Sequence, residues 1–374
     1  MLQRQWLKGL SMALALALVA AACGDDDDDD DAGSDTGGES NGGGEETSDF
    51  LGCQVTDTGG VDDRSFNQTA FAGLEQAGEE LGFEAQVLES QSEADYEPNI
   101  SALMDEGCNL IITVGFLLGD ATAVAAEANP DQQFAIVDVD FFDADAEQDI
   151  TYDNVAELTF STDQAAFLAG YVAAATTETG TVGTYGGINL PTVTIFMEGF
   201  EAGINFYNDE QGTEVELVGW STAEGDGLFT GDFENQANGR TTTEQLLDEG
   251  ADIIMPVAGP VGLGSIEAVE AAGGDARLIW VDTDGCVSVE ESCDLFLTSV
   301  MKNMDVAVHD TTVAAAEGDF QSGLYTGTLE NEGVGLAPFH EFEESVPQEV
   351  KDAVEDLQQR IIDGDPEIET RPSA

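Results

Sequence analysis

The segment Asn109-Leu-Ile-Ile-Thr-Val-Gly115 predicts a buried β-strand that ends at a glycine. Residues 121–128 follow it with the apolar spacing of a short helix, and residues 133–139 supply a second apolar strand. An apolar strand, a helix and another apolar strand are typical of a parallel sheet that helices cover on both faces. This stretch therefore indicates an α/β fold.

The same alternation of strands and helices continues on both sides of that segment. Further strands are expected at residues 53–57, 83–88, 180–185, 214–220, 253–257 and 277–281, and further helices at 66–82, 98–106, 163–176, 192–210, 232–249 and 264–272. Two runs of this pattern predict two doubly wound parallel-sheet lobes joined by hinge crossovers. We expect an N-terminal lobe of residues 50–162 plus about 286–325, a C-terminal lobe of 163–285 plus about 326–346, and a C-terminal helix and tail at 347–374.

The N-terminus has the pattern of a bacterial lipoprotein signal peptide over residues 1–22. Arg4 and Lys8 precede a short apolar run at 10–19, and small residues lead into Cys23, whose thiol can carry lipid. A transmembrane helix is the alternative, but the apolar run is too short to span a bilayer comfortably. We therefore expect a chain that starts at Cys23 and is lipid-anchored at the extracytoplasmic face of the cell membrane.

The chain is strongly acidic, with 77 Asp and Glu against 9 Lys and Arg and a net charge of −68. Residues 23–49 contain no large apolar side chain before Phe50, which predicts a disordered acidic tether that binds cations only loosely. Elsewhere the acidic residues are spread among ordinary apolar ones, which is typical of a protein from high salt, where screening weakens self-repulsion. Such a surface repels nucleic acid, so no nucleic-acid partner is expected.

Four cysteines follow Cys23, and an exported chain favours pairing them. Cys53 and Cys108 each begin an expected strand, so their sulfur atoms lie side by side if the two strands are parallel neighbours. Cys286 and Cys293 lie in one short loop. We therefore favour the pairs 53–108 and 286–293 over a zinc site, because the spacings do not suit zinc and the two histidines, His309 and His340, are distant in sequence.

Open parallel sheets bind their ligands beyond the carboxyl ends of their strands. With two lobes, the strand ends of both sheets can face a common cleft. Residues directly after the expected strands are therefore candidates for ligand contact: Asp57, Gly115, Phe116, Asp138, Tyr185, Gly186, Gly259 and Asp282.

A series of motifs in fixed order resembles those of one protein family. They are Val55-Thr-Asp-Thr-Gly-Gly-Val-Asp-Asp-Arg-Ser-Phe-Asn67, Val114-Gly-Phe116, Phe167-Leu-Ala-Gly-Tyr171, Gly183-Thr-Tyr-Gly-Gly187, Phe196-Met-Glu-Gly-Phe-Glu-Ala-Gly203, Val257-Ala-Gly259, Val281-Asp-Thr-Asp284 and Thr298-Ser-Val-Met-Lys302. From Cys53 to Gly335 the chain resembles the basic membrane protein family of solute-binding lipoproteins, which includes the purine nucleoside receptor lipoproteins of ABC importers. The resemblance implies a type I periplasmic-binding-protein fold that closes on a nucleoside.

A nucleoside offers a flat base and a vicinal diol, and the residues of these motifs suit both. The aromatic residues expected to stack on the base are Phe66, Phe116 and either Phe196 or Phe200. Asp57 and Asn67 are expected at the polar edge of the base, with Asp57 as a hydrogen-bond acceptor. Asp282 is expected to accept both ribose hydroxyls, while Lys302 donates to the ribose and balances that carboxylate.

The same resemblance implies an ABC permease and its ATPase as partners, a monomeric chain and no cofactor. Two places depart from the usual family pattern near the expected sugar position. Pro260 follows Gly259, and the segment after Asp284 carries the excursion from Cys286 to Cys293. The sequence therefore constrains the identity of the sugar less than it constrains the fold.

Other interpretations of these residues exist. Phe66 could be a core residue and Asp57 a turn residue, while Asp282 and Asp284 could form a metal-binding pair, although one of two such side chains more often points away. The segment from Asp57 to Asp63 loosely resembles the aspartate cluster of calcium-dependent nucleoside hydrolases, but it lacks the leading aspartate. A receptor for a sensor kinase is a further alternative. The sequence shows no nucleophile–base arrangement, phosphate loop or cofactor motif, so we expect no enzyme activity and no metal.

Overall fold

The computed structural model describes residues 50–143, 148–366 and 368. The expected signal peptide at 1–22, the lipid-carrying Cys23 and the acidic tether at 23–49 lie outside these residues, as does part of the C-terminal tail. None of the helices that the structure describes is long and apolar enough to cross a bilayer.

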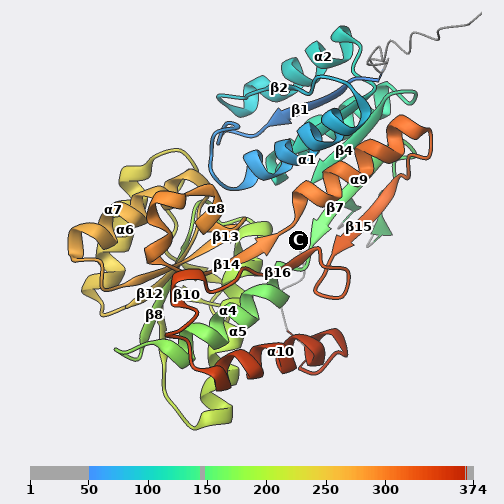
Figure 1. The fold of residues 1–374 in the computed structure, drawn as a ribbon. Helices are drawn as coiled ribbons and strands as arrows, with labels where there is room; N and C mark the ends of the chain where they lie inside the picture. Colours follow the sequence, from blue (N-terminus) through green and yellow to red (C-terminus); the bar gives the residue numbers. More distant parts are fainter. Residues whose placement is uncertain (1–49, 144–147, 367, 369–374) are drawn as a thin grey trace, which may run out of the picture. The chain divides into compact units, whose positions relative to one another are not determined.

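The first sheet takes most of its strands from the N-terminal part of the chain and its edge strand from near the C-terminus (Figure 1). Among the described residues it has six strands in the order β15-β7-β4-β3-β1-β2, and all neighbouring pairs are parallel. The strands are β1 (Gly52–Thr56), β2 (Gln86–Leu88), β3 (Leu110–Val114), β4 (Gln133–Val137), β7 (Val155–Phe160) and β15 (Gly323–Gly327).

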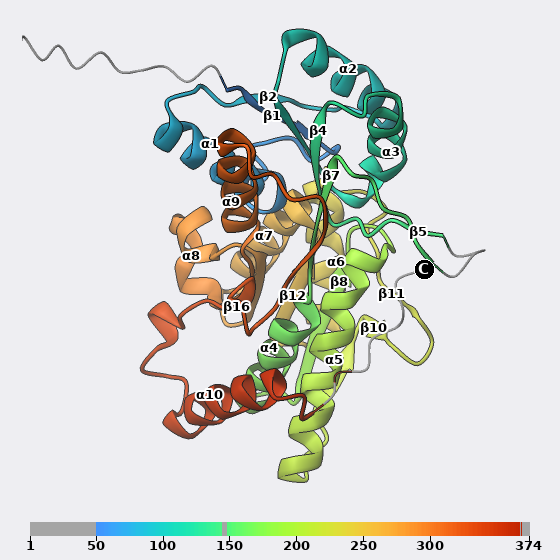
Figure 2. The same cartoon turned by 90° about the vertical axis from the view of Figure 1, so that its right-hand side faces the viewer.

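Helices cover both faces of this sheet, which explains why its central strands are buried along nearly their whole length. Helices α1 (Phe66–Leu81) and α9 (Met304–Glu317) lie together on one face, and α2 (Tyr96–Glu106) and α3 (Gly119–Ala128) on the other (Figure 2). Alternate residues of β3 lie on opposite faces of the sheet. Ile112 packs in the core that contains Leu74 of α1, and Ile111 packs in the core that contains Ile100 of α2.

The second sheet also has six strands within the described part of the chain, in the order β16-β14-β13-β12-β8-β9. They are β8 (Thr181–Gly186), β9 (Glu216–Val218), β12 (Ile253–Val257), β13 (Arg277–Asp282), β14 (Phe296–Lys302) and β16 (Val334–Leu336). The pairing of β14 with β16 is antiparallel and the other pairs are parallel. Each sheet with its helices forms one lobe, as the sequence pattern predicted.

The helices of the second lobe again cover both faces of its sheet. Their core residues place α4 (Thr162–Thr176), α5 (Pro191–Gln211) and α10 (Gln348–Ile362) on one face, and α6 (Gln236–Asp248), α7 (Leu263–Ala272) and α8 (Gly285–Ser288) on the other. The remaining short elements are the 3-10 turns η1 (Glu93–Asp95), η2 (Phe116–Leu118), η3 (Gly259–Gly262), η4 (Glu290–Leu295) and η5 (His340–Phe342), and the strand pairs β5 (Phe142–Asp143) with β6 (Gln148–Asp149) and β10 (Trp220–Ser221) with β11 (Asp226–Gly227).

The chain crosses between the lobes at the two outermost strands on one side of each sheet. It enters the second lobe after β7, returns to the first after β14, and crosses again after β15. Because β14 pairs with β13 and β16, residues up to Lys302 belong to the second sheet. The expected boundary at about 286 for the returning segment is therefore too early, since the pattern of β14 alone does not reveal which sheet it joins.

Glycines allow α4 and α5 to pack with their backbones in close approach. A Cβ atom at Gly170 would overlap the carbonyl oxygen of Phe200, and one at Gly203 would overlap the carbonyl oxygen of Phe167. The neighbouring backbone cannot move away as a flexible side chain could. These positions therefore require glycine because of packing, although their φ angles are ordinary.

We expect Gly203→Ala to destabilise the protein by about 1–3 kcal/mol, because the added methyl group meets backbone atoms of α4. Helix propensity alone would favour the alanine by roughly 1 kcal/mol, so a net loss identifies the packing effect. Gly335→Ala is the control, since a Cβ atom there has no neighbour within 4 Å. Denaturant unfolding at constant salt measures both variants, and equal stabilities would contradict the packing argument.

Two disulfides join the cysteines of the body in the pairs that the sequence favoured. Cys53 of β1 is bonded to Cys108, which lies just before the neighbouring parallel strand β3. Cys286 is bonded to Cys293 across α8 and η4. The first bridge closes a much longer segment, with a sequence separation of 55 against 7 for the second.

We expect the two bridges to stabilise the fold unequally. Replacing both Cys53 and Cys108 by alanine should cost about 4 kcal/mol, against about 2 kcal/mol for the pair 286 and 293, because the longer loop removes more entropy from the unfolded chain. Denaturant unfolding of the two double variants under one salt condition measures the difference. A larger loss for the short loop would contradict this order.

Candidate ligand-binding site

A cavity lies where the carboxyl ends of strands from the two sheets face each other. Its wall combines apolar and aromatic side chains with a few polar groups, as is usual for small-molecule sites. The first lobe supplies Asp57 after β1, Gly115 after β3 and Asp138 after β4. The second lobe supplies Gly259 after β12, and the last residues of β13 and β14, Asp282 and Lys302.

Aromatic side chains form part of the wall of this cavity. Phe66 is the first residue of α1, Phe116 begins η2, and Phe196 lies one turn inside α5. Phe116 is 36% exposed, whereas Phe196 is 2% exposed. The cavity therefore has one aromatic side chain at its surface and others that are largely covered.

Lys302 is a buried cation surrounded by aromatic rings. Its Nζ atom lies 2.5 Å from Oδ2 of Asp138, and the two side chains are 3% and 8% exposed. The same atom is 4.9 Å from the ring centroid of Phe66, 5.4 Å from that of Phe160 and 5.8 Å from that of Phe196. The Lys302 side chain is thus held by an ion pair and by cation–π contacts.

The expected partner of Lys302 was Asp282, but the structure shows a different arrangement. Lys302 forms its ion pair with Asp138 of the first lobe. Asp282 instead accepts a hydrogen bond from Ser65 Oγ at 2.7 Å. Lys302 still acts on Asp282 through its charge, because it lowers the pKa of that carboxyl against the larger effect of burial.

Burial dominates the protonation of the carboxyl groups that line the cavity. It raises the pKa of Asp57, Asp138 and Asp282 above the ordinary value, and the charge of Lys302 opposes this for Asp138 and Asp282. Burial also raises the pKa of Asp63 to about 7, against the effect of its backbone hydrogen bonds. The site thus gathers more carboxyl groups than cations, so a ligand that donates hydrogen bonds would stabilise it.

Asp57 and Asn67 form a small acceptor pair in the wall. Oδ1 of Asp57 accepts from Asn67 Nδ2 at 2.8 Å and from the backbone N–H of Gly59 at 3.1 Å. Both of these hydrogen bonds end at Oδ1 and not at Oδ2. Within the residues that the structure covers, the buried Oδ1 of Asn67 has no partner. Gly115 permits this geometry, because its φ is 117° and a Cβ atom there would lie 2.9 Å from Asp57 Oδ2.

Comparison with known proteins agrees with this geometry. The family model described as "ABC transporter substrate-binding protein PnrA-like" matches residues 51–370. The chain belongs to this family. Its members are the substrate-binding components of ABC transporters, so a small ligand and an ABC permease are partners of the PnrA-like family as a whole.

Individual relatives of this PnrA-like chain cover most of its length. The "ABC transporter nucleoside-binding protein BmpA" of Lactococcus lactis is 31% identical over 338 residues, which are 86% of this chain and 89% of that protein. The "CD4+ T-cell-stimulating antigen" of Listeria innocua is 32% identical over 389 residues and all of both chains. A solved ABC solute-binding protein from Aeropyrum pernix has a TM-score of 0.76 at 28% identity and covers 86% of this chain and 94% of its own. The fold is accordingly the type I periplasmic-binding-protein fold.

The cavity of the PnrA-like chain contains most, but not all, of the residues singled out from the sequence. Those that line it are Asp57, Phe66, Asn67, Phe116, Asp138, Phe196, Gly259, Asp282 and Lys302. Phe200 does not, because it lies one turn farther along α5 and is fully buried in the core. Tyr185 is also fully buried, and its hydroxyl group is bonded to Ser265 Oγ at 2.8 Å.

Some lining residues were not expected from the sequence. Phe233 lies in the connection before α6, and Leu190 and Val193 lie at the start of α5. Phe160, which contacts Lys302, ends a strand that the apolar pattern did not reveal. The sequence pattern predicts a helix over 232–249 that would contain Phe233, whereas α6 begins only at Gln236, so the pattern does not mark Phe233 as a loop residue at the cavity.

A calcium cluster is not supported at residues 57–63. Both oxygens of Asp63 accept backbone hydrogen bonds at the start of α1: Oδ1 from Ser65 and Gln68, each at 3.0 Å, and Oδ2 from Asn67 at 2.7 Å. Asp63 therefore fixes the loop before α1. Its oxygens are engaged by the chain itself, unlike those of a hydrolase calcium ligand.

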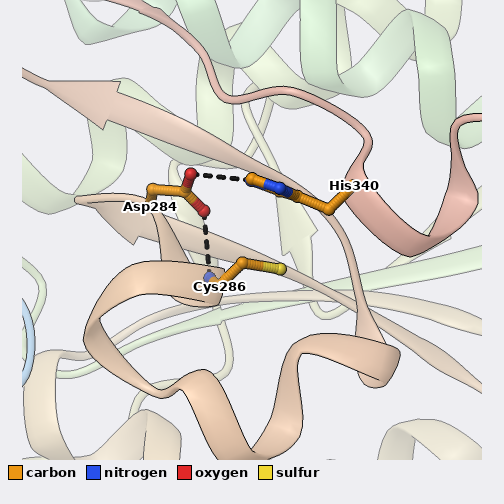
Figure 3. A group of neighbouring side chains, drawn as sticks. All are labelled: Asp284, Cys286 and His340. Carbon is orange, nitrogen blue, oxygen red and sulfur yellow. Dashed lines mark hydrogen bonds and ion pairs between the residues drawn. The ribbon is translucent and has the colours of Figure 1, made fainter.

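A second group of polar side chains lies outside the cavity, in the second lobe (Figure 3). Asp284 accepts from the backbone N–H of Cys286 at 2.9 Å, and its other oxygen lies 2.7 Å from Nε2 of His340. Although the three residues are close enough to suit a metal ion, the sulfur of Cys286 is already bonded to Cys293. Asp284 thus caps α8 and bonds His340, and it does not pair with Asp282.

We expect the ion pair between Lys302 and Asp138 to stabilise the PnrA-like fold more than any coupling of Lys302 to Asp282. Lys302→Met should cost about 3–5 kcal/mol, since it leaves Asp138 buried without its partner. Double-mutant cycles with Asp138→Asn and with Asp282→Asn, measured by denaturant unfolding at constant salt, should give the larger coupling for Asp138.

Lys351→Met is the matched control, because Lys351 pairs with the exposed Glu343 at 2.7 Å. It should change the unfolding free energy by less than about 1 kcal/mol. A coupling to Asp282 that equals or exceeds the coupling to Asp138 would contradict the arrangement described above.

Proposed function

We propose that this protein is a lipid-anchored, extracytoplasmic binding protein that captures a nucleoside, preferably a purine nucleoside, and presents it to an ABC permease. It acts as a monomer, needs no cofactor and catalyses no reaction. The observation that carries the proposal is the combination of aromatic rings, several buried carboxyl groups and one ammonium group in the same cavity.

The base is assigned to the aromatic part of the cavity. Phe66, Phe116 and Phe196 line it, and offset stacking of a base on such rings contributes roughly 0.5–1.5 kcal/mol per ring beyond burial. Asn67 Oδ1 is an acceptor without a partner among the described residues. The hydrogen bonds from Asn67 and Gly59 to Asp57 both end at Oδ1, which leaves Oδ2 as a second acceptor. Two neighbouring acceptors favour a base edge with N–H donors, such as N1–H and the 2-amino group of guanine.

An adenine base would form fewer favourable hydrogen bonds with the same two acceptor atoms. Its N1 atom is an acceptor, so at least one of the protein acceptors would face another lone pair instead of a proton. Since a buried polar group without a partner costs about 1–3 kcal/mol, we expect 6-oxopurine nucleosides to bind more tightly than adenosine.

The sugar is assigned to the end of the cavity that contains Asp282 and Lys302. The carboxylate of Asp282 can accept hydrogen bonds from two neighbouring hydroxyls, and Lys302 can donate to them while it stays paired with Asp138. The excess of carboxyl groups would repel a phosphate. The ligand is therefore a nucleoside and not a nucleotide.

A thermal-shift titration in molar salt tests this function. We expect guanosine and inosine to raise the melting temperature most, adenosine less, and guanosine 5′-monophosphate not at all. Phe196→Leu should weaken guanosine binding because the ring lines the cavity, whereas Phe200→Leu should lower the melting temperature without changing affinity because that ring lies in the core.

A response to sugars or amino acids without a response to any nucleoside would overturn the ligand assignment. Release of free base during incubation with guanosine would overturn the assignment as a binding protein that is not an enzyme. Mass spectrometry of the exported protein tests the anchor separately, since a diacyl group on Cys23 is expected.

A further inference from the structure

A short loop of the first lobe makes polar contacts with the second lobe beside the cavity. It consists of residues 63–65, the last part of the connection from β1 to α1, and is called the bridging loop below. Ser65 Oγ donates to Asp282 Oδ2 at 2.7 Å, and Arg64 Nη1 donates to the carbonyl oxygen of Ser288 at 2.9 Å. The indole N–H of Trp280 donates in turn to the carbonyl oxygen of Arg64 at 3.3 Å.

Hydrogen bonds within the first lobe tie the bridging loop to the start of α1. The carboxyl group of Asp63 accepts the backbone N–H groups of Ser65, Asn67 and Gln68, which ties the loop to the first turn of α1. Arg64 has a φ of 59°, a left-handed conformation that a non-glycine residue adopts only where its surroundings hold it. The loop therefore presents a rigid surface to the second lobe.

Asp282 depends on this loop for its orientation. It ends β13 with a φ of 71° and is 6% exposed. Among the residues that the structure describes, Ser65 supplies the one side-chain hydrogen bond to Asp282, because Lys302 is bonded to Asp138. Ser65 is itself fully buried. The bond occupies Oδ2, which leaves Oδ1 for a ligand.

We propose that Ser65 is a positioning residue that orients Asp282 across the lobe boundary, so that Asp282 is set to accept ribose hydroxyls only while the lobes are together. Arg64 holds the bridging loop against α8 and slows the separation of the lobes. The inference rests on the proposed nucleoside function and adds to it a residue that contacts the carboxylate instead of the ligand. Any movement that opened the cavity between β1 and β13 would break these bonds.

Binding of guanosine and of 2′,3′-dideoxyguanosine to the full chain tests the role of Ser65. Ser65→Ala should weaken guanosine binding by at least about tenfold, because a hydrogen bond to a carboxylate is lost, and should leave dideoxyguanosine binding nearly unchanged. Asp282→Asn should show the same selective loss, and the double variant should lose little more. Ser65→Thr keeps the hydroxyl group and should restore selectivity.

The role of Arg64 has a different signature. Arg64→Met should speed dissociation of both ligands alike in stopped-flow measurements, because its side chain bonds to α8 and not to Asp282. Arg240→Met removes the same charge from an exposed pair with Glu244 and should leave both rates unchanged. Ser92→Ala removes an exposed serine–aspartate bond and is the matched control for Ser65.

Each outcome separates the positioning role from the proposed function. If the wild-type chain binds neither compound, the nucleoside function fails and the role of Ser65 fails with it. If the wild type binds guanosine but Ser65→Ala weakens both ligands equally, or neither, the function stands and the positioning role is wrong. Circular dichroism of each variant establishes that the fold is retained.

Discussion

A buried ammonium group is what allows so many carboxyl groups to share one cavity. Lys302 is paired with Asp138 and lies close to three aromatic rings, and its charge also acts on Asp282. Without Lys302, burial and mutual repulsion would raise the pKa values of Asp138 and Asp282 further, because the charge that opposes both effects would be lost. Lys302 is also the last residue of β14, directly before the chain returns to the first lobe. One side chain thus supports both the electrostatics of the site and the junction of the lobes.

The two lobes contribute to the cavity through the same backbone arrangement. Their strand orders correspond, so that β4 of the first sheet has the place that β13 has in the second. The aspartates at these two strand ends, Asp138 and Asp282, have nearly the same left-handed φ, 69° and 71°. Lys302 distinguishes them, because it bonds Asp138 and leaves Asp282 to Ser65. A repeated backbone arrangement therefore yields two carboxylates with different partners.

The sequence predicted the features that local patterns encode. Buried strands separated by amphipathic helices gave the two lobes, and residues at strand ends gave most of the cavity wall. Four strands of the two six-stranded sheets, β7, β14, β15 and β16, were not predicted, because they lie next to the crossovers between the lobes. The partner of Lys302 was also misassigned, since the distance between Asp138 and Lys302 depends on how the two sheets face each other. Phe196 and Phe200 are equivalent in a helical pattern, and only packing separates them.

The position of the crossovers has a mechanical consequence. The segments after β7, β14 and β15 leave or enter the two strands at one edge of each sheet, which are β15 and β7 in the first sheet and β16 and β14 in the second. Covalent links gathered at one edge resist twisting and sliding, and they leave bending about that edge as the easiest relative motion. A swing of this kind has a long lever arm at the far side of the sheets. A small angular change there would therefore carry a solute from full enclosure to bulk water.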